Sequence, residues 1–241
     1  VNDKQREAIV SSLSQTLTLV EGPPGTGKTR TASLCVYHMA HQGLGRVLVV
    51  ASSNVAVNNL ANACYTLGLK VIRYFPSSRD ESYAVGLEPK MLIDHWTQAG
   101  TELWALQRLR KQYTLSVDDR ADLKRLQRRQ YADALQKVDV VCCTCSAAGD
   151  APLASLRFHF VLADEAAQAI EPELFVALRN GARQLTLVGD TKQLRPIVLN
   201  RRAREAGLQV SLFERLCLAG ARHIMLDVQY RMHPSISLFP S

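Results

Sequence analysis

Short apolar runs alternate with helical patterns in two parts of the chain, residues 1–75 and 138–229. The runs are apolar on both faces, as strands inside a parallel sheet are. They read TLTLVE, RVLVVA, KVIRYF, VDVVCCTC, FHFVLADE, QLTLVGD and HIMLDV. Before the first run, Asn2 is a capping residue, and Ala8, Ile9 and Leu13 share one helical face. This alternation predicts an α/β fold in which helices flank a parallel sheet.

The alternation stops between residues 76 and 137. Leu103, Leu106 and Leu109 recur there at helical spacing, and Ser116 with Asp119 resembles a capping box that starts a second helix. We therefore predict a helical hairpin inserted into the sheet domain. The basic residues on its faces are Arg108, Arg110, Lys111, Arg120, Lys124, Arg125, Arg128 and Arg129.

The excess of positive charge is concentrated in this hairpin. The formal net charge of the chain is +7, which allows a polyanionic partner such as nucleic acid. A basic helical face is also common as a plain solvated surface, so the charge alone leaves both interpretations open.

Cysteine and histidine positions do not indicate a metal site. The six cysteines lack the paired spacing of zinc ligands, and the six histidines are scattered. We expect the cysteines to behave as small apolar residues in a reducing compartment, the cytoplasm or, as an alternative, the nucleus. No apolar run approaches the roughly 20 residues that span a bilayer, so we expect no membrane partner.

The segment GPPGTGKT follows an apolar run, precedes a helical pattern and matches the phosphate-binding loop in full. Its glycines let backbone N–H groups wrap around phosphates. In such loops a lysine, here Lys28, reaches the β and γ phosphates, and a hydroxyl, here that of Thr29, ligates Mg²⁺. The predicted nucleotide-binding residues are Gly22, Pro23, Pro24, Gly25, Thr26, Gly27, Lys28 and Thr29.

Two further runs end in polar residues that suit hydrolysis of a nucleotide. Asp164 and Glu165 follow one strand, so that Asp164 can hold the metal while Glu165 acts as general base on the attacking water. The next run ends near Asp190 and Gln193, and an amide at Gln193 can contact both the γ-phosphate and that water. The chain has no NKxD element, so we expect adenine rather than guanine.

These segments occur in the order that is typical of superfamily 1 helicases. Together with NDKQREAI, VLVVASSNVAVNNL, VVCCTCSAAGD and VQYRMHPSISLFPS they most closely resemble the up-frameshift RNA helicases of nonsense-mediated mRNA decay. The resemblance covers nearly the whole chain. It implies a P-loop, RecA-like ATPase domain that uses ATP and Mg²⁺ and binds single-stranded RNA, with decay-factor proteins as further partners.

The resemblance also implies roles for particular residues. Gln5 would bind the adenine edge and Tyr230 would stack on the ring, while Arg231 would act as an arginine finger and Gln193 as the γ-phosphate sensor. With Lys28 and Glu165, Gln193 and Arg231 form the catalytic set. Single-stranded RNA would contact Ser53, Asn54 and Thr144, and the basic hairpin would lie beside the RNA channel.

A few positions depart from the up-frameshift pattern. Thr191 and Lys192 replace the usual His and Cys, Arg195 replaces a small residue, and Asn58 replaces an acid. These differences concern the assignment to one pathway and leave the ATPase residues unchanged.

Residues 230–241 resemble the start of the crossing into a second RecA-like domain. In these helicases ATP sits between the two domains, so we expect this chain to bind ATP but to hydrolyse it feebly.

Three alternatives remain open from the sequence. They are a DNA or dual-specificity helicase of the same superfamily, an ATP-gated RNA clamp or scaffold, and a P-loop ATPase that binds no nucleic acid.

Overall fold

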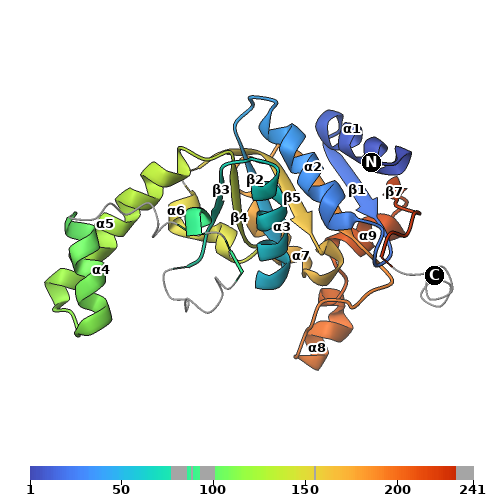
Figure 1. The fold of residues 1–241 in the computed structure, drawn as a ribbon. Helices are drawn as coiled ribbons and strands as arrows, with labels where there is room; N and C mark the ends of the chain where they lie inside the picture. The colour runs from blue at the N-terminus through green and yellow to red at the C-terminus, as the bar shows by residue number, and fades with distance from the viewer. Residues whose placement is uncertain (77–85, 88, 93–100, 155, 232–241) are drawn as a thin grey trace.

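The computed structural model describes residues 1–76, 86–87, 89–92, 101–154 and 156–231 (Figure 1). Seven strands form one sheet in the order β3-β4-β2-β5-β6-β1-β7, and all neighbouring strands are parallel. The strands are β1 (Leu17–Glu21), β2 (Arg46–Ala51), β3 (Val71–Arg73), β4 (Val140–Thr144), β5 (Phe158–Asp164), β6 (Gln184–Gly189) and β7 (His223–Met225). Each predicted apolar run contains one of them, which confirms the α/β fold.

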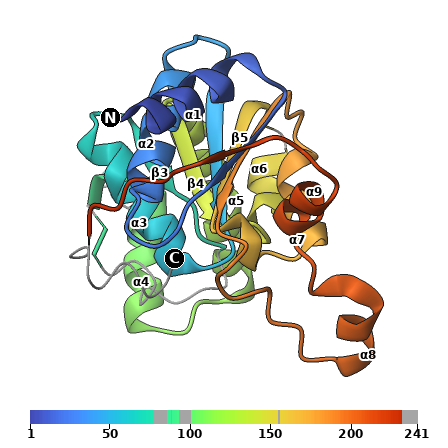
Figure 2. The same ribbon diagram turned by 90° about the vertical axis from the view of Figure 1, so that its right-hand side faces the viewer.

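Helices lie between the strands in the chain and cover both faces of the sheet (Figures 1 and 2). The α-helices are α1 (Asp3–Ser14), α2 (Lys28–Ala40), α3 (Asn54–Thr66), α4 (Glu102–Gln112), α5 (Val117–Leu135), α6 (Ala151–Ala154), α7 (Glu171–Leu178), α8 (Arg201–Ala203) and α9 (Leu212–Leu218). Short turns of other helix types are η2 (Pro89–Met91), η4 (Ala147–Gly149), η5 (Ala166–Gln168) and η6 (Arg204–Leu208). Across the described residues, every helix is too short or too polar to cross a membrane.

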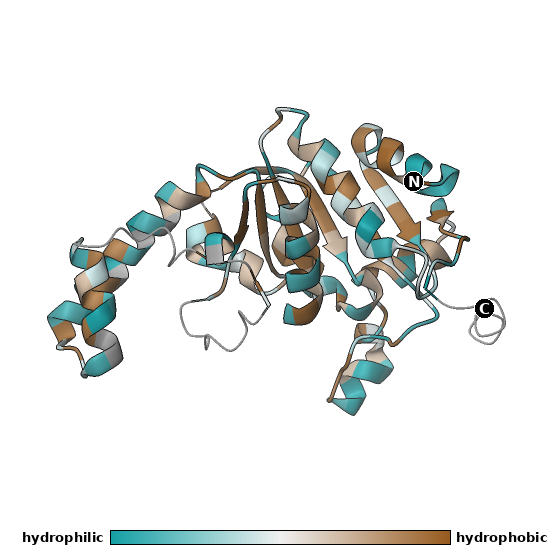
Figure 3. Ribbon diagram, viewed as in Figure 1, coloured by the Kyte–Doolittle hydropathy of each residue, from teal (hydrophilic) through white to brown (hydrophobic). Residues whose placement is uncertain are grey.

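An apolar core lies on each face of the sheet, between the strands and the helices that cover them, because successive side chains of a strand point to opposite faces. In β2, Leu48 and Val50 join a core that includes residues of α7 and α9. Val47 and Val49 join the other core, which includes residues of α1, α2 and α3. Strands buried on both faces are largely apolar, which explains the mostly brown colour of the sheet in Figure 3.

Helices α4 and α5 form the predicted hairpin and extend away from the sheet (Figure 1). Ser116 caps α5, since its hydroxyl accepts a hydrogen bond of 3.1 Å from the Asp119 N–H. A small core of Leu103, Leu106, Leu115 and Leu123 joins the two helices. Leu109, which recurs at the same helical spacing, is 44% exposed and lies outside this core. The division of the chain into domains stays a prediction.

The basic residues of the hairpin lie at its surface as far as their side chains are described. Arg108, Arg120, Arg125 and Arg129 are exposed. The side chains of the other four predicted basic residues, Arg110, Lys111, Lys124 and Arg128, fall outside the described part of the structure. Arg125 forms an ion pair with Asp122 at 2.8 Å, which offsets part of its charge.

The carboxyl ends of the strands lie at one edge of the sheet, because the sheet is parallel. Ala51 at the end of β2 pairs with Thr144 on one side and with Asp164 on the other. Glu21 at the end of β1 pairs with Gly189 of β6. Parallel α/β sheets bind their ligands at this edge. The predicted site residues that follow β1, β2, β4, β5 and β6 are therefore brought into one row.

Candidate nucleotide-binding site

The loop between β1 and α2 has the geometry of a phosphate-binding loop. Gly25 and Gly27 have φ angles of 85° and 83°, which L-residues rarely adopt. Gly27 caps α2 without a side-chain hydrogen bond, so the first N–H groups of the helix remain available to a bound anion. The loop and the helix N-terminus together form a positively polarised cradle, which fits a phosphate group.

Lys28 lies within this cradle and is 9% exposed. Its Nζ donates hydrogen bonds to the Gly22 carbonyl at 2.7 Å and to the Pro23 carbonyl at 3.4 Å. The ammonium group is thus held over the loop by the loop's own carbonyl groups. Thr29 follows it and is half-buried on the first turn of α2.

Asp164 and Glu165 differ in their surroundings, as the sequence predicts. Asp164 is 3% exposed at the end of β5, whereas Glu165 is half-buried. Burial, and then the charge of Glu165, raise the pKa of Asp164 to about 7. The Glu165 N–H and the Lys28 ammonium act in the opposite direction and favour the ionised carboxylate. A buried carboxylate beside a lysine-bearing loop suits a divalent cation, which would supply the missing positive charge.

Glu165 adopts a left-handed backbone conformation with φ 50° and ψ 38°. Among the described residues it is the only one other than glycine with positive φ. Such a conformation costs on the order of 1 kcal/mol and tends to persist at functional sites. Its carboxylate accepts a hydrogen bond of 3.1 Å from Gln168 Nε2, which fixes the side chain beside the end of β5.

The turn after β6 contributes Asp190 and Gln193. Asp190 is 4% exposed and accepts hydrogen bonds from the Lys192 N–H at 3.0 Å and from Gln193 Nε2 at 2.7 Å. The Gln193 amide is therefore held at the same edge as Lys28 and Glu165, since β6 lies between β5 and β1. The end of β6 packs closely against η5, because a Cβ atom at Gly189 would lie 3.1 Å from the Ala167 nitrogen.

Gln5 reaches the same loop from α1. It is 5% exposed, and its Nε2 donates to the Thr26 carbonyl at 3.3 Å. Its Oε1 accepts from the Asn2 N–H at 3.1 Å as part of a capping box. The structure thus places Gln5 against the phosphate-binding loop, and its contact with adenine stays a prediction.

The segment after β7 crosses the phosphate-binding loop. The Tyr230 N–H donates to the Gly25 carbonyl at 2.9 Å, and the Tyr230 hydroxyl accepts from Asn2 Nδ2 at 3.0 Å. Gln229 Nε2 donates to the Pro24 carbonyl, and Gln229 Oε1 accepts from the Arg231 N–H. Tyr230 and Arg231 are exposed beside the loop. Gln229 is not among the residues predicted from the sequence, although it directly precedes Tyr230.

The predicted RNA contacts lie at the ends of the neighbouring strands. Ser53 caps α3, where its Oγ accepts from the Ala56 N–H at 3.1 Å. Thr144 is 5% exposed at the end of β4, and its hydroxyl lies 3.3 Å from Ser146 Oγ. Both side chains stabilise the backbone of their own turns, and their contact with RNA stays a prediction.

Asn54 is held by Arg73, which is also not among the residues predicted from the sequence. Arg73 is 2% exposed and donates from its guanidinium to Asn54 Oδ1 and to Asn58 Oδ1, each at 2.8 Å. Its guanidinium also donates to the Tyr74 carbonyl at 2.6 Å. The buried arginine fixes the first turn of α3. Its only signal in the sequence is a charged residue in the interior of the apolar run KVIRYF.

The comparisons with known proteins agree with this geometry. A family model described as an AAA domain matches residues 1–86 and 98–201, and a second model of the same description matches residues 208–241. The chain is 46% identical to the regulator of nonsense transcripts 1 homologue of Arabidopsis thaliana, across all of this chain and 20% of that protein. It is 45% identical to the ATP-dependent helicase NAM7 of Saccharomyces cerevisiae, across all of this chain and 25% of that protein. The chain thus spans about a quarter or less of the length of these relatives.

Among solved structures, the fold is similar to that of arterivirus nonstructural protein 10, a helicase determined in complex with DNA. The TM-score is 0.50 at 13% identity, over 95% of this chain and 40% of the viral one. This likeness shows the fold. The likeness to regulators of nonsense transcripts confirms the resemblance that the order of the sequence motifs predicts.

Proposed function

This chain belongs to the AAA-domain family, and we propose that it forms the ATP-binding part of an ATP-dependent RNA helicase of superfamily 1. The observation that carries the proposal is the convergence of Lys28, Asp164 and Gln193 at the adjacent carboxyl ends of β1, β5 and β6. A phosphate cradle, a buried metal-type carboxylate and an amide sensor are the parts that phosphoryl transfer to water requires.

The binding steps follow from the groups in the loop. The N–H groups of the loop and of α2 surround the β and γ phosphates of ATP, and Lys28 turns from the Gly22 carbonyl to the phosphates. Thr29 and Asp164 would hold Mg²⁺, which would neutralise charge on the phosphate oxygens. The donor set fits this ion, since a hydroxyl and a buried carboxylate are hard oxygen ligands.

Glu165 and Gln193 act on the attacking water. Glu165 is half-buried beside the buried Asp164, so its carboxylate can accept a proton from water in line with the γ-phosphate. Gln193 contacts the γ-phosphate or the water through the amide that now faces Asp190. Tyr230 and Gln5 bind the adenine, and Arg231 stabilises charge in the transition state.

Single-stranded RNA binds along the other half of the same edge, at Ser53, Asn54 and Thr144. We call the ends of β2 and β4 the RNA half of the edge and the ends of β1, β5 and β6 the ATP half. The two halves are adjacent because Ala51 pairs with both Thr144 and Asp164. A change in the ATP half can therefore reach the RNA half through one strand, β2. The exposed arginines of the hairpin add positive charge that a nucleic acid can contact.

The assignment to nonsense-mediated decay is supported by the names of the relatives, which are regulators of nonsense transcripts. By this proposal the whole protein acts in the cytoplasm together with decay-factor proteins. A second RecA-like domain completes the ATP site, since an arginine finger is worth about 10³ to 10⁵ in rate for phosphoryl transfer.

The test compares ATP hydrolysis by this chain with hydrolysis by a protein that carries both RecA-like domains. Each is measured with and without saturating single-stranded RNA, and strand separation is measured for the two-domain protein. We expect the chain to bind ATP and hydrolyse it slowly, and the two-domain protein to hydrolyse it rapidly with RNA. Absence of RNA stimulation in the two-domain protein would contradict the helicase proposal, and DNA stimulation in place of RNA stimulation would assign a DNA helicase.

A further inference from the structure

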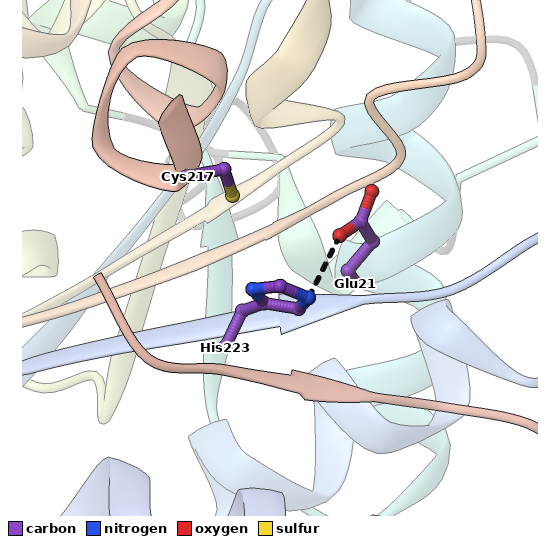
Figure 4. Close-up of side chains that lie close together, drawn as sticks. All are labelled: Glu21, Cys217 and His223. Atoms are coloured by element: carbon purple, nitrogen blue, oxygen red, sulfur yellow. Dashed lines mark ion pairs between the residues drawn. The ribbon is translucent and has the colours of Figure 1, made fainter. Parts of the chain in front are cut away.

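Three side chains with metal-binding atoms meet beside the phosphate-binding loop (Figure 4). Glu21 ends β1, Cys217 lies in α9 and His223 begins β7. One ligand atom of each lies within 4.8 Å of the other two, and no second group of this kind occurs among the residues that the structure describes. Because the three residues lie far apart in the sequence, their spacing could not reveal the cluster.

The register of the edge strand explains why the three meet. His223 pairs with Leu19 of β1, and Glu21 lies two residues beyond Leu19. Residues two apart in a strand point to the same face, so His223 and Glu21 share the face of the sheet that α9 covers. Cys217 approaches from that helix, and Figure 4 shows its sulfur directed toward the other two side chains.

Glu21 has one oxygen engaged by the protein and one facing the cluster. Its Oε1 accepts from the Thr191 N–H at 3.2 Å and from the Thr191 hydroxyl. Its Oε2 lies 3.4 Å from His223 Nε2. The Glu21 side chain is 8% exposed, whereas that of His223 is 37% exposed, so solvent reaches the cluster from the histidine side.

We propose that Glu21, Cys217 and His223 bind one Zn²⁺ ion, with water in the fourth position. A thiolate, an imidazole and a carboxylate are the ligand types that zinc prefers. With ligand bonds of about 2.0–2.3 Å, neighbouring ligand atoms in a tetrahedron lie roughly 3.3–3.8 Å apart. The 3.4 Å between Glu21 and His223 already has this value, and a small movement of Cys217 closes the set. An ion pair alone would account for Glu21 and His223 but not for the thiol.

Zinc binding at this position would displace a proton from the thiol. Burial, and then the nearby carboxylates of Glu21 and Glu214, raise the pKa of Cys217, so the free chain holds a neutral thiol at neutral pH. A divalent cation reverses this effect because it stabilises the thiolate directly.

The site would fasten the edge strand to the rest of the sheet. Strand β7 has three residues, and the chain continues from it to Gln229 and Tyr230, which contact the phosphate-binding loop. A cation that joins β1, α9 and β7 holds the start of this segment in place. The inference does not rest on the proposed helicase function, because it uses none of the predicted catalytic residues.

The test is a titration of the whole 241-residue chain with Co²⁺, without nucleotide, followed by absorption. We expect one equivalent to produce thiolate-to-cobalt charge transfer and the visible bands of a tetrahedral site, and Zn²⁺ to displace it. Cobalt bound by oxygen ligands alone, as at Asp164, gives no thiolate band. Absence of this band in the folded chain would overturn the proposal.

Variants assign the ligands. Cys217→Ser should abolish the charge-transfer band, and His223→Gln and Glu21→Gln should each weaken affinity at least about 10-fold. His41→Gln serves as the matched control, because His41 is an exposed histidine outside the cluster. A band that persists in Cys217→Ser would overturn the assignment.

The thermal unfolding midpoint, measured with and without Zn²⁺, tests the site even in variants that are less stable than the wild type. Zn²⁺ should raise the thermal unfolding midpoint of the wild-type chain and of His41→Gln, with release of a proton, because ligands that bind only the native state stabilise it. The midpoint of Cys217→Ser should not rise. An equal rise in all of these proteins would contradict a defined site.

Discussion

The two halves of the carboxyl edge of the sheet are built differently. In the ATP half, Asp164 and Lys28 are charged groups buried within a few residues of strand ends. In the RNA half, the hydroxyl groups of Ser53 and Thr144 cap or brace their own turns, and the buried charge of Arg73 already has protein hydrogen-bond partners. Ionisation of the buried carboxylate in the ATP half is therefore unfavourable until a cation binds beside it. The polar groups of the RNA half already have partners within the protein.

Glu165→Gln should have the largest effect, and it should be confined to the ATP half. Loss of a general base reduces turnover by about 10² to 10⁴, while the neutral amide leaves the phosphate cradle intact. We expect ATP binding and RNA binding by the two-domain protein to persist while RNA-stimulated hydrolysis falls. Normal turnover would remove Glu165 from the role of base. Gln168→Glu is not a suitable control, because Gln168 donates to Glu165. Glu205→Gln is the control, because Glu205 is an exposed residue of η6.

Asp164→Asn should stabilise the chain in the absence of Mg²⁺ and nucleotide. The pKa of Asp164 is about 7 in the folded chain and 3.8 ordinarily, so the unfolded chain releases its proton at lower pH than the folded chain does. The folded state therefore loses stability as pH rises from about 4 to about 7. The variant removes this loss, so its free energy of unfolding at pH 8 should be about 1–4 kcal/mol higher than that of the wild type.

Chemical denaturation of the wild-type chain and the variant at pH 5 and pH 8 measures this gain. Asp227→Asn is the matched control, because Asp227 is exposed. A gain from Asp164→Asn that is the same at both pH values would contradict the effect of burial on the Asp164 carboxylate.

Gly25→Ala tests the contact between the phosphate-binding loop and the segment that carries Tyr230. Gly25 has φ +85°, and a Cβ atom there would overlap Gln229 Oε1. Gly43→Ala is a close control, since Gly43 has φ +70° and nothing within 4 Å of the added atom. Both variants carry the backbone strain, so Gly25→Ala should lose about 1–3 kcal/mol more in unfolding free energy than Gly43→Ala. Equal losses would mean that Gln229 moves aside freely.

Ser53→Ala should have the smallest effect, and it should be confined to the RNA half. Loss of the cap on α3 costs about 1 kcal/mol in unfolding free energy. Loss of one hydrogen bond to a phosphate weakens RNA affinity by roughly 2- to 10-fold. ATP affinity should not change. Ser14→Ala, which removes an exposed hydroxyl of α1, is the control, and equal RNA affinity in both variants would exclude Ser53 as an RNA contact.

The sequence was sufficient to predict the features that depend on local pattern. The strands are continuous apolar runs because both faces of the sheet are covered, and the caps at Asn2 and Ser116 follow from short-range hydrogen bonds. The phosphate-binding loop is also local, since Gly25 and Gly27 supply its backbone conformation within one segment.

Contacts between distant segments were not predictable in this way. Gln229 packs on Gly25, Arg73 binds Asn54 and Asn58, and Glu21 meets Cys217 and His223 only after the sheet has formed. The exposure of Leu109 has the same cause, because the helical spacing defines a face but not how much of that face the neighbouring helix covers.

ATP binding by this chain with Mg²⁺, measured for the wild type and for Lys28→Ala, tests the central claim most directly. Lys28 is the ammonium group of the cradle, so its loss should weaken ATP affinity by about 100-fold while RNA affinity remains as in the wild type. Circular dichroism establishes that the variant is folded. Equal ATP affinity in the two folded proteins would contradict the site at the ends of β1, β5 and β6.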